Sequence, residues 1–258
     1  MKITVPNNFN QNFSSALARL SDFLQPDNLR AAISRLWRAT PEPLPPGPAS
    51  TPNVNAIALN LCNGDADLAT WMLRWLAYPL RVPGTKMDNA LWFCGGPGAG
   101  KSMFFQRVAA PMHAWRSVTV DTQFHSHFNA WASKKAFAVV EDFDGRAGSL
   151  RRAKLLMTSS SILIERKLAE PVLERNQINY VFCSGHIDAL PADVGNRRFA
   201  VFNVGTPLHP DVYGEAATEI LNGAAHDWHH FLLNELDMGD FTPSTPAPIS
   251  QAFPEQAI

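Results

Sequence analysis

Several features that would assign this chain to a broad class of protein are missing from its sequence. No apolar run approaches the roughly 18 residues of a membrane-spanning helix, so no membrane span is predicted. The N-terminus lacks the apolar segment of a signal peptide. The formal net charge is −1, so the surface as a whole is not basic, and only a local basic strip could bind nucleic acid.

Cysteine is also scarce, and its placement excludes the usual zinc motifs. Cys62, Cys94 and Cys183 lie far apart, and no C-x-x-C spacing occurs. We interpret them as buried, reduced thiols of a cytoplasmic protein. The histidines of segment 226–230 lack the H-E-x-x-H spacing, so no metal site is predicted there.

What is present divides the chain into four parts. Residues 1–40 carry apolar residues at helical spacing and predict a small helical region, which either packs on the main domain or forms an oligomerisation collar. Residues 41–64 begin with a proline-rich run and predict an extended linker. Residues 65–241 form the main domain, and 242–258 predict a flexible tail rich in Pro, Ser and Thr. Helices of the main domain are expected at 65–78, 103–112, 121–132, 149–157 and 211–237.

One segment organises the main domain. A short apolar run ending at Cys94 predicts a buried strand, and a glycine-rich turn then leads into a helix. The turn fits G-x-x-x-x-G-K-[ST], the P-loop, whose backbone N–H groups can wrap a polyphosphate. The alternative is a strand–helix turn without a ligand. The matching residues are Gly95, Gly96, Pro97, Gly98, Ala99, Gly100, Lys101 and Ser102.

Two acidic residues follow another apolar strand. Residues 136–140 are apolar and run directly into Glu141 and Asp142, about 40 residues after the P-loop, the arrangement of a Walker B element. Such a strand places carboxylates beside the phosphates, where Mg²⁺ and the attacking water are bound. An acidic turn without catalytic role is the alternative.

Positive charge is concentrated downstream. Residues 146–175 contain seven Lys and Arg against three Glu, and 162–173 predict a hairpin. This segment is either a solvated face or a contact for a phosphate backbone. Arg197 and Arg198 directly precede another apolar strand, and they need a carboxylate or phosphate partner, such as a neighbour's ATP in the manner of an arginine finger.

The order of these motifs resembles a known family. The resemblance lies in Trp71 to Leu80, the P-loop, Glu141-Asp142, Ile164 to Lys167, Val181 to Ser184, Asn196 to Phe199 and Phe231 to Phe241. Together these are similar to the helicase domain of phage and poxvirus-type primase–helicases, a branch of the superfamily 3 helicases. The resemblance implies an α/β fold with an AAA+-like P-loop NTPase core and a central, mostly parallel sheet. It further implies a homo-oligomer, a hexameric ring, that uses ATP and Mg²⁺ to move along single-stranded DNA during the replication of a phage or mobile element.

The same resemblance implies roles for individual residues. Lys101 would contact the β- and γ-phosphates, Ser102 and the acids Glu141 and Asp142 would serve Mg²⁺ and water, and Arg197 or Arg198 would be the arginine finger. Arg166 and Lys167 match the basic part of a DNA-contacting hairpin. The family's third motif ends in Asn; here Gly185 and His186 stand in its place, so His186 is the candidate γ-phosphate sensor.

Three other functions remain open from the sequence. The first 64 residues are too short for a primase domain, so we expect a stand-alone motor or a partner of a separately encoded primase or initiator. An AAA+ loader or remodelling ATPase that does not unwind DNA is the first alternative. The second is a non-catalytic replication scaffold with a vestigial ATP site. A small-molecule P-loop kinase is the third, although it leaves the paired arginines and the basic hairpin unexplained.

Overall fold

The computed structural model describes residues 47–185 and 198–247. The chain divides into two units between Leu44 and Pro45, so every described residue belongs to the second unit. The predicted helical region 1–40 lies outside the described residues. Within the described part, no helix is both long enough and apolar enough to cross a membrane.

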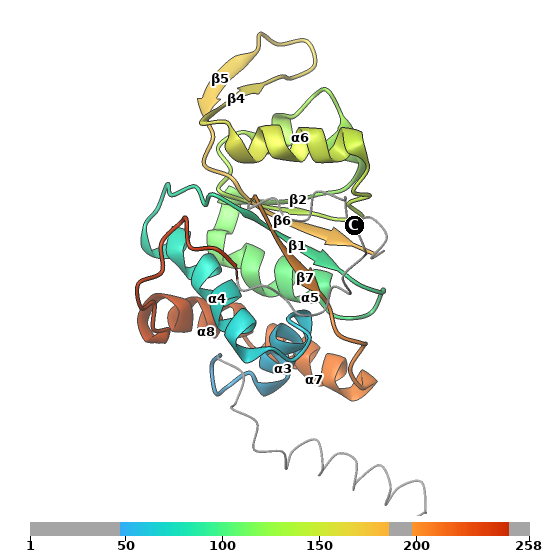
Figure 1. The fold of residues 1–258 in the computed structure, drawn as a ribbon, viewed down its shortest axis with the longest axis vertical. Coiled ribbons are helices and arrows are strands. Elements are labelled where there is room, and N and C mark those ends of the chain that lie inside the picture. Colours follow the sequence, from blue (N-terminus) through green and yellow to red (C-terminus); the bar gives the residue numbers. More distant parts are fainter. Residues whose placement is uncertain (1–46, 186–197, 248–258) are drawn as a thin grey trace, which may run out of the picture. The chain divides into compact units, whose positions relative to one another are not determined.

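A five-stranded, fully parallel sheet forms the centre of this unit (Figure 1). The strands follow the spatial order β2-β3-β6-β1-β7, so β6 lies between the strand that leads into the P-loop and the strand that leads into the acids. The predicted α/β fold with a central parallel sheet is therefore confirmed. The strands are β1 (Ala90–Cys94), β2 (Ser117–Val120), β3 (Phe137–Val140), β6 (Asn179–Ser184) and β7 (Phe199–Asn203).

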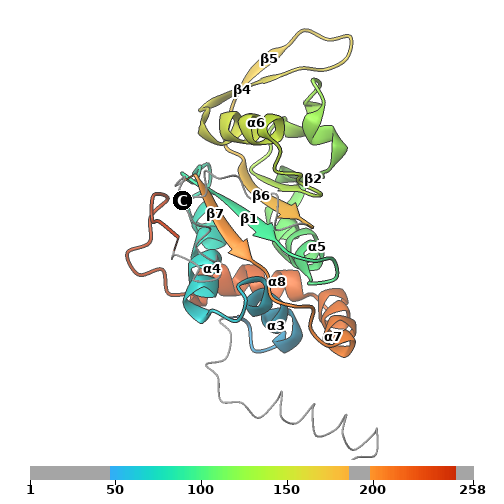
Figure 2. The same cartoon turned by 45° about the vertical axis from the view of Figure 1, so that its right-hand side comes forward.

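Helices cover both faces of the sheet, as a buried parallel sheet requires. Figures 1 and 2 show α6 (Ala147–Thr158) on one face and most other helices on the opposite face. The helices of the opposite face are α3 (Pro52–Leu61), α4 (Ala66–Arg81), α5 (Lys101–Phe104), α7 (Pro210–Leu221), α8 (Ala224–His230) and the π-helical turn η6 (Phe231–Glu235). A separate antiparallel hairpin of β4 (Ser161–Ile164) and β5 (Val172–Arg175) extends beyond α6.

The residues of β1 explain why this strand is central. All five are buried, and alternate side chains enter two different cores. Leu91 and Phe93 join the larger core under α3, α4 and α5, where Phe93 stacks on Phe202 with ring centroids 4.3 Å apart. Trp92 faces α6 and meets Phe143 edge-on at 5.2 Å. A strand with apolar residues at every position thus fixes the end from which the P-loop starts.

The predicted extended linker over 41–64 is wrong for its last part. Residues 52–61 form α3, which begins with Pro52 at its first position, where a missing N–H costs nothing. Val54, Ile57 and Leu61 are fully buried in the main core. The helix is therefore a structural part of the main domain. The prolines that indicated a linker end at Pro52, so the predicted linker extended past the segment whose composition supported it.

The helix predicted over 103–112 is present but starts earlier and changes its pitch. It begins at Lys101 as α5, passes through the π-helical turn η1 (Phe105–Ala109) and ends as the 3₁₀ helix η2 (Ala110–Arg116). Pro111 stands at the start of η2. Proline cannot donate the helical hydrogen bond and its ring crowds the carbonyl four residues earlier, so a regular α-helix cannot continue through this point.

The predicted helix over 121–132 is wrong. Its two 3₁₀ turns are η3 (Thr122–His125) and η4 (Ala130–Ala132). The reason is Asn129, whose buried side chain accepts from Glu165 N at 2.7 Å and donates to Leu163 O at 2.9 Å. The Asn129 side chain thus bonds to the hairpin backbone instead of supporting a helix. Asparagine side chains commonly compete with helical structure in this way.

In the C-terminal part, the structure agrees with the predicted helices and differs from the predicted flexible tail. The helical stretch predicted at 211–237 is confirmed as α7, α8 and η6, interrupted at Gly223, which has φ 103°. Of the predicted flexible tail 242–258, the described residues 242–247 are held against the domain: Pro243 O accepts from Asp88 N at 3.2 Å, and Ser244 donates to the Asp88 carboxylate.

Candidate nucleotide site and opposite basic edge

The glycine-rich loop leaves the carboxyl end of β1 and enters α5. Gly98 and Gly100 have φ of 79° and 91°, in the left-handed region that favours glycine. A Cβ on Gly100 would lie 2.6 Å from Ile57 Cγ2 of α3, so glycine is required there by both backbone and space. The loop is thereby packed tightly against α3.

Lys101 is held within this loop. Its Nζ donates to Gly95 O at 2.7 Å and to Gly96 O at 2.8 Å, and the residue is only 9% exposed. A buried ammonium satisfied by two carbonyls of the loop keeps a positive charge where the polyphosphate of a P-loop ligand binds.

The predicted acid Glu141 reaches the start of the P-loop helix from β3. One carboxylate oxygen accepts from Ser102 Oγ at 3.0 Å, and the other accepts from Gln106 Nε2 at 2.7 Å. Ser102 and Gln106 are four residues apart and share one helix face. Gln106 was not predicted as a site residue, although its i+4 spacing from Ser102 was a usable signal.

These oxygens suit a magnesium ion. Mg²⁺ takes octahedral oxygen ligands at about 2.0–2.1 Å, so neighbouring ligand oxygens lie about 3 Å apart, the observed separation of Ser102 Oγ and Glu141 Oε2. Among the described residues no three His, Cys, Asp or Glu side chains gather into a metal cluster. Mg²⁺ is commonly held by one or two protein ligands together with phosphates and water.

Asp142 has an unusual backbone. It has φ 49°, in the left-handed region, and its side chain is exposed. The conformation is fixed on its C-terminal side, where Phe143 N donates to Cys183 O at 2.8 Å and the Phe143 ring is buried against Phe182. A left-handed aspartate costs about 1–3 kcal/mol and persists where the surrounding structure imposes it, often at a functional site.

A cavity of about 500 Å³ joins these groups. Its volume falls in the range of about 300–1,000 Å³ of small-molecule sites. Five lining residues were not predicted as site residues, among them Ser184, at the end of β6 between the loop and the acids, and Tyr213 of α7. The described residues that line it are Pro97, Gly98, Ala99, Gly100, Lys101, Ser102, Met103, Glu141, Asp142, Cys183, Ser184, Gly185 and Tyr213.

Two buried thiols remain protonated: Cys183, which lines this cavity, and Cys94, which directly precedes the P-loop. Burial raises the pKa of Cys94 to about 12, although the nearby Lys101 charge opposes this shift. Burial also raises the pKa of Cys183, assisted by the Glu141 charge. Both thiols are therefore neutral at physiological pH and add no negative charge next to the P-loop. The expected buried, free cysteines are confirmed.

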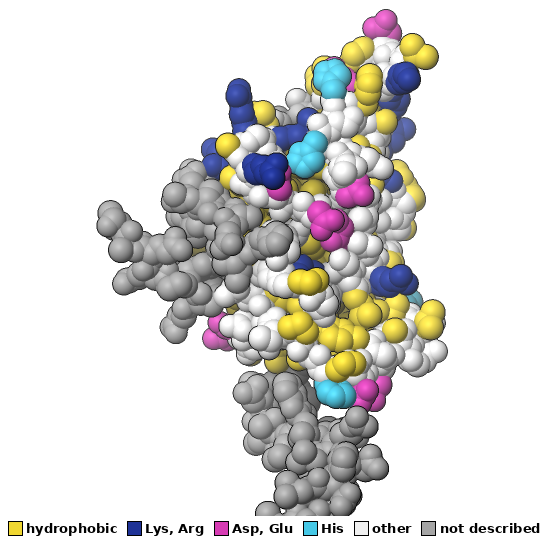
Figure 3. Space-filling view, turned by 90° about the vertical axis from the view of Figure 1, so that its right-hand side faces the viewer, with side chains coloured by type: hydrophobic (Ala, Val, Ile, Leu, Met, Phe, Trp, Pro, Cys, Tyr) yellow, Lys and Arg dark blue, Asp and Glu magenta, His cyan; other side chains and the backbone are white. Residues whose placement is uncertain are grey.

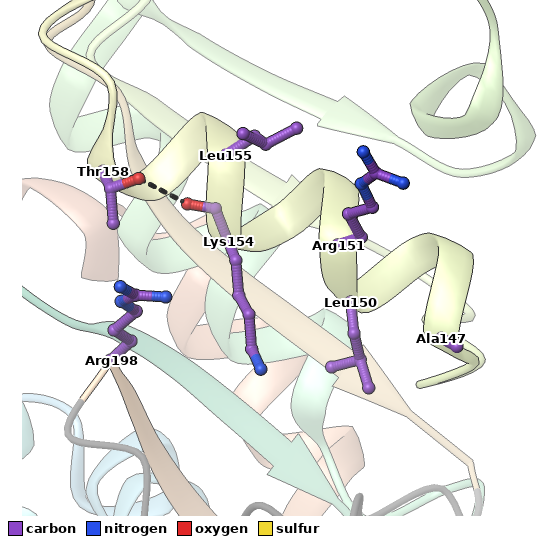
Figure 4. Close-up of a pocket in the computed structure, with 7 residues that line it drawn as sticks. All are labelled: Ala147, Leu150, Arg151, Lys154, Leu155, Thr158 and Arg198. Carbon is purple, nitrogen blue, oxygen red and sulfur yellow. Dashed lines mark hydrogen bonds between the residues drawn. The ribbon is translucent and has the colours of Figure 1, made fainter.

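A second cavity, of about 570 Å³, lies between α6 and Arg198 at the amino end of β7. Arg198 precedes β7, whose first residue pairs with the first residue of β1, whereas the P-loop follows the last residue of β1. Figure 4 shows Lys154 extending from α6 toward the sheet and Arg198 rising from the start of β7 into the same space. Arg151 also lines this cavity, so it is basic and lies away from the chain's own P-loop.

The predicted hairpin is confirmed, and its two basic residues, Arg166 and Lys167, have different surroundings. Arg166 donates to Ser133 Oγ at 2.9 Å and lies 3.8 Å from the Glu174 carboxylate, so it braces the hairpin against segment 130–135. The hydrogen bond from Ser133 lowers the pKa of Glu174, and the Lys134 N–H and the Arg166 charge add to this. Lys167 is exposed and precedes Leu168, which is 98% exposed.

The charge near this hairpin is mixed with apolar surface. On the face drawn in Figure 3, Lys and Arg side chains gather over the upper half of the molecule, among hydrophobic side chains and a few acids. Exposed apolar residues of the hairpin are Leu163, Leu168, Val172 and Leu173. Two further predicted site residues, Arg197 and His186, lie outside the described residues, so the arginine-finger choice and the sensor remain predictions.

Comparisons with known proteins support the fold more than the chemistry. Residues 93–198, less than half of the chain, match a family described as a family of unknown function (DUF5906). No curated protein matches the chain.

Among solved structures, the apo structure of the NrS-1 C-terminal region (305–718) matches with a TM-score of 0.63 and 22% identity, covering 77% of this chain and 50% of that one. Two A-form apo structures of the same region match with TM-scores of 0.61 and 0.59 at 23% and 21% identity. The chain thus spans about half the length of these structures, and at this identity the likeness shows the fold alone.

Proposed function

We propose that this chain is an ATP-hydrolysing motor of the superfamily 3 helicase type that works as a ring on single-stranded DNA in the replication of a phage or mobile element. The observation that carries the proposal is the meeting of the P-loop helix and the acid strand: Ser102 Oγ and Glu141 Oε2 are 3.0 Å apart beside the enclosed Lys101. A glycine-rich turn without a ligand has no need of a carboxylate at this place.

In this proposal, each group at the carboxyl edge has one task. Lys101 exchanges its loop carbonyls for β- and γ-phosphate oxygens, while the loop's backbone N–H groups bind the remaining phosphate oxygens. Ser102 and Glu141 would hold Mg²⁺, which when bound neutralises charge on the β- and γ-oxygens. Asp142, exposed and one residue further along, accepts a proton from the attacking water and orients it.

The basic residues at the other edge belong to a neighbouring site. Arg198 stands at the start of β7, on the edge opposite its own P-loop, so in a ring of identical subunits it would face the ATP of the next chain.

Lys167 at the exposed hairpin tip would contact the phosphate backbone of DNA, a contact that is sequence-tolerant and weakened by salt.

The test is ATP hydrolysis with and without single-stranded DNA over a dilution series of the full chain. We expect DNA-stimulated activity whose specific rate falls on dilution, because each site needs two subunits. Lys101→Ala should abolish turnover, whereas Lys135→Ala, a lysine outside both cavities, serves as the matched control and should remain active. Full turnover by Lys101→Ala would refute the proposal.

A loader or remodelling ATPase that does not unwind DNA is the second candidate. The exposed apolar residues of the hairpin favour it, because Leu168 and Leu173 suit a protein contact better than a phosphate backbone. Strand displacement on forked DNA separates the two functions: a helicase releases the displaced strand in an ATP-dependent way, and a loader hydrolyses ATP without releasing it.

A further inference from the structure

Tyr213 is the one aromatic side chain among the described residues that line the P-loop cavity. It comes from α7, far from the P-loop in sequence, and it lies close to the loop: a Cβ on Gly100 would be 3.3 Å from its ring carbon Cε1. The ring is half-buried, with one part packed on the main core and the rest facing the cavity.

The position of this ring is fixed at both ends. Its hydroxyl accepts a hydrogen bond from Leu208 N at 2.9 Å, and its aromatic body packs on the core beneath α7. Because the hydroxyl is engaged with the backbone, the ring is held in one orientation and presents carbon surface to the cavity. A half-buried, oriented aromatic face at a ligand cavity is the arrangement that stacks a planar ring.

Most of the polar side chains that line the cavity already have tasks in the proposed phosphate and Mg²⁺ site. Lys101, Ser102 and Glu141 belong to the phosphate and Mg²⁺ groups described above. The side chains of Pro97, Ala99 and Met103, which line the cavity together with Tyr213, are apolar. Two more polar side chains line the cavity: Asp142, which the proposal assigns to the attacking water, and Ser184 at the end of β6. Beyond the groups assigned to phosphate, Mg²⁺ and water, the described lining side chains therefore offer a nucleobase one hydroxyl, that of Ser184, and no set of hydrogen bonds by which its edge could be read.

From this arrangement we infer that Tyr213 is the nucleobase-binding residue of the site and that it binds the base by stacking, with little discrimination among the bases. This inference rests on the proposed ATP site and adds its specificity: the substrate class is nucleoside triphosphates in general. Stacking tolerates any base because each has a π-face, whereas strong selection requires hydrogen bonds to the base edge.

Binding of ATP and of inorganic tripolyphosphate to the full chain, each with Mg²⁺, tests this directly. Stacking on an aromatic side chain contributes about 1–3 kcal/mol per base, so Tyr213→Ala should weaken ATP binding about 5- to 150-fold. Tripolyphosphate lacks a base, and its affinity should be unchanged. Tyr213→Phe, which keeps the ring but loses the bond from Leu208 N, should retain most of the ATP affinity, and Tyr213→Leu should not.

Tyr78→Ala is the matched control, because Tyr78 also packs partly buried on the main core but does not line the cavity. It should lower stability without changing the ratio of ATP to tripolyphosphate affinity. GTP, CTP and UTP should bind the wild-type chain within about tenfold of ATP. Equal ATP affinity of wild type and Tyr213→Ala, or selection for ATP far beyond tenfold, would overturn the inference while leaving the ATP site standing. Failure of wild type to bind either ligand would overturn the proposed function instead.

Discussion

Replacement of Arg198 tests whether the two edges of the sheet serve two different ATP sites. β7 runs from Phe199 to Asn203 and lies parallel to β1. From Arg198 to Asn203 at the end of β7 there are five steps of about 3.3 Å each, or about 16 Å. The P-loop lies beyond that end, so the separation is longer than an arginine side chain can span. Arg198 therefore cannot reach a γ-phosphate placed at the P-loop of its own chain.

The expected loss is large and can be rescued by a second inactive chain. An arginine finger contributes about 10³–10⁵ to the rate, so Arg198→Ala alone should be almost inactive if this residue is the finger. A 1:1 mixture with Lys101→Ala should regain activity, because a mixed ring contains interfaces with an intact P-loop on one side and an intact Arg198 on the other. With random assembly about a quarter of the interfaces are of this kind.

The assay is steady-state ATP hydrolysis of each variant and of the mixture, at concentrations where wild type is fully active. Arg197→Ala, measured in parallel, separates the two neighbouring arginines, since only the variant of the finger should lose turnover and be rescued. Circular dichroism confirms that the inactive chains are folded. Absence of rescue, with both variants inactive and assembled, would show that the arginine acts within its own chain and would refute the geometric reasoning.

Three further predictions concern single positions. Gly100→Ala should cost about 1–2 kcal/mol in unfolding free energy from the left-handed backbone alone, and more from its clash with Ile57; adding Ile57→Ala should relieve only the second part, measured by denaturant unfolding. Lys167→Ala should leave stability within about 0.5 kcal/mol yet reduce the salt slope of single-stranded DNA binding by about 1; an unchanged slope would remove Lys167 from the interface. Burial, with Arg116 and His229 nearby, lowers the pKa of His113 to about 4. The unfolded chain therefore binds more protons between pH 4 and about 6.5, and stability should fall by about 2 kcal/mol from pH 7 to pH 5. Thermal melts of wild type and His113→Phe should show a weaker pH dependence in the variant.

The elements that the sequence predicted correctly are those in which local pattern and tertiary structure agree. The strand before the P-loop is apolar at every position, and a parallel sheet buries both of its faces. The glycines of the loop and the acids after residues 136–140 follow from chemistry that operates within a few residues. Ser102 and Glu141 were expected at one site for this reason, and the structure brings them into contact.

The failures have a common cause in contacts between distant segments. Residues 121–132 have a helical composition, but Asn129 bonds to the backbone of residues 163 and 165, which lies more than 30 positions further along the chain. Tyr213 reaches the cavity only because α7 packs beside α3 and the P-loop. No local spacing connects such a residue to Gly100, so single-sequence reasoning could identify the phosphate end of the cavity and not the aromatic end.

The hairpin is joined to α6 and to the segment before β1 by bonds that make independent movement costly. Buried Asn176, which follows β5, donates to Leu156 O at 2.7 Å and to Ser159 O at 3.0 Å, and Lys86 donates to the same two carbonyls. These bonds close the C-terminal end of α6, connect it to the hairpin and link both to the segment before β1. Breaking them would leave buried polar groups without partners, at about 1–3 kcal/mol for each group. In the proposed motor, the hairpin should therefore move together with the whole domain, by rotation of one subunit against the next, because these bonds hold its base to α6 and to the segment before β1.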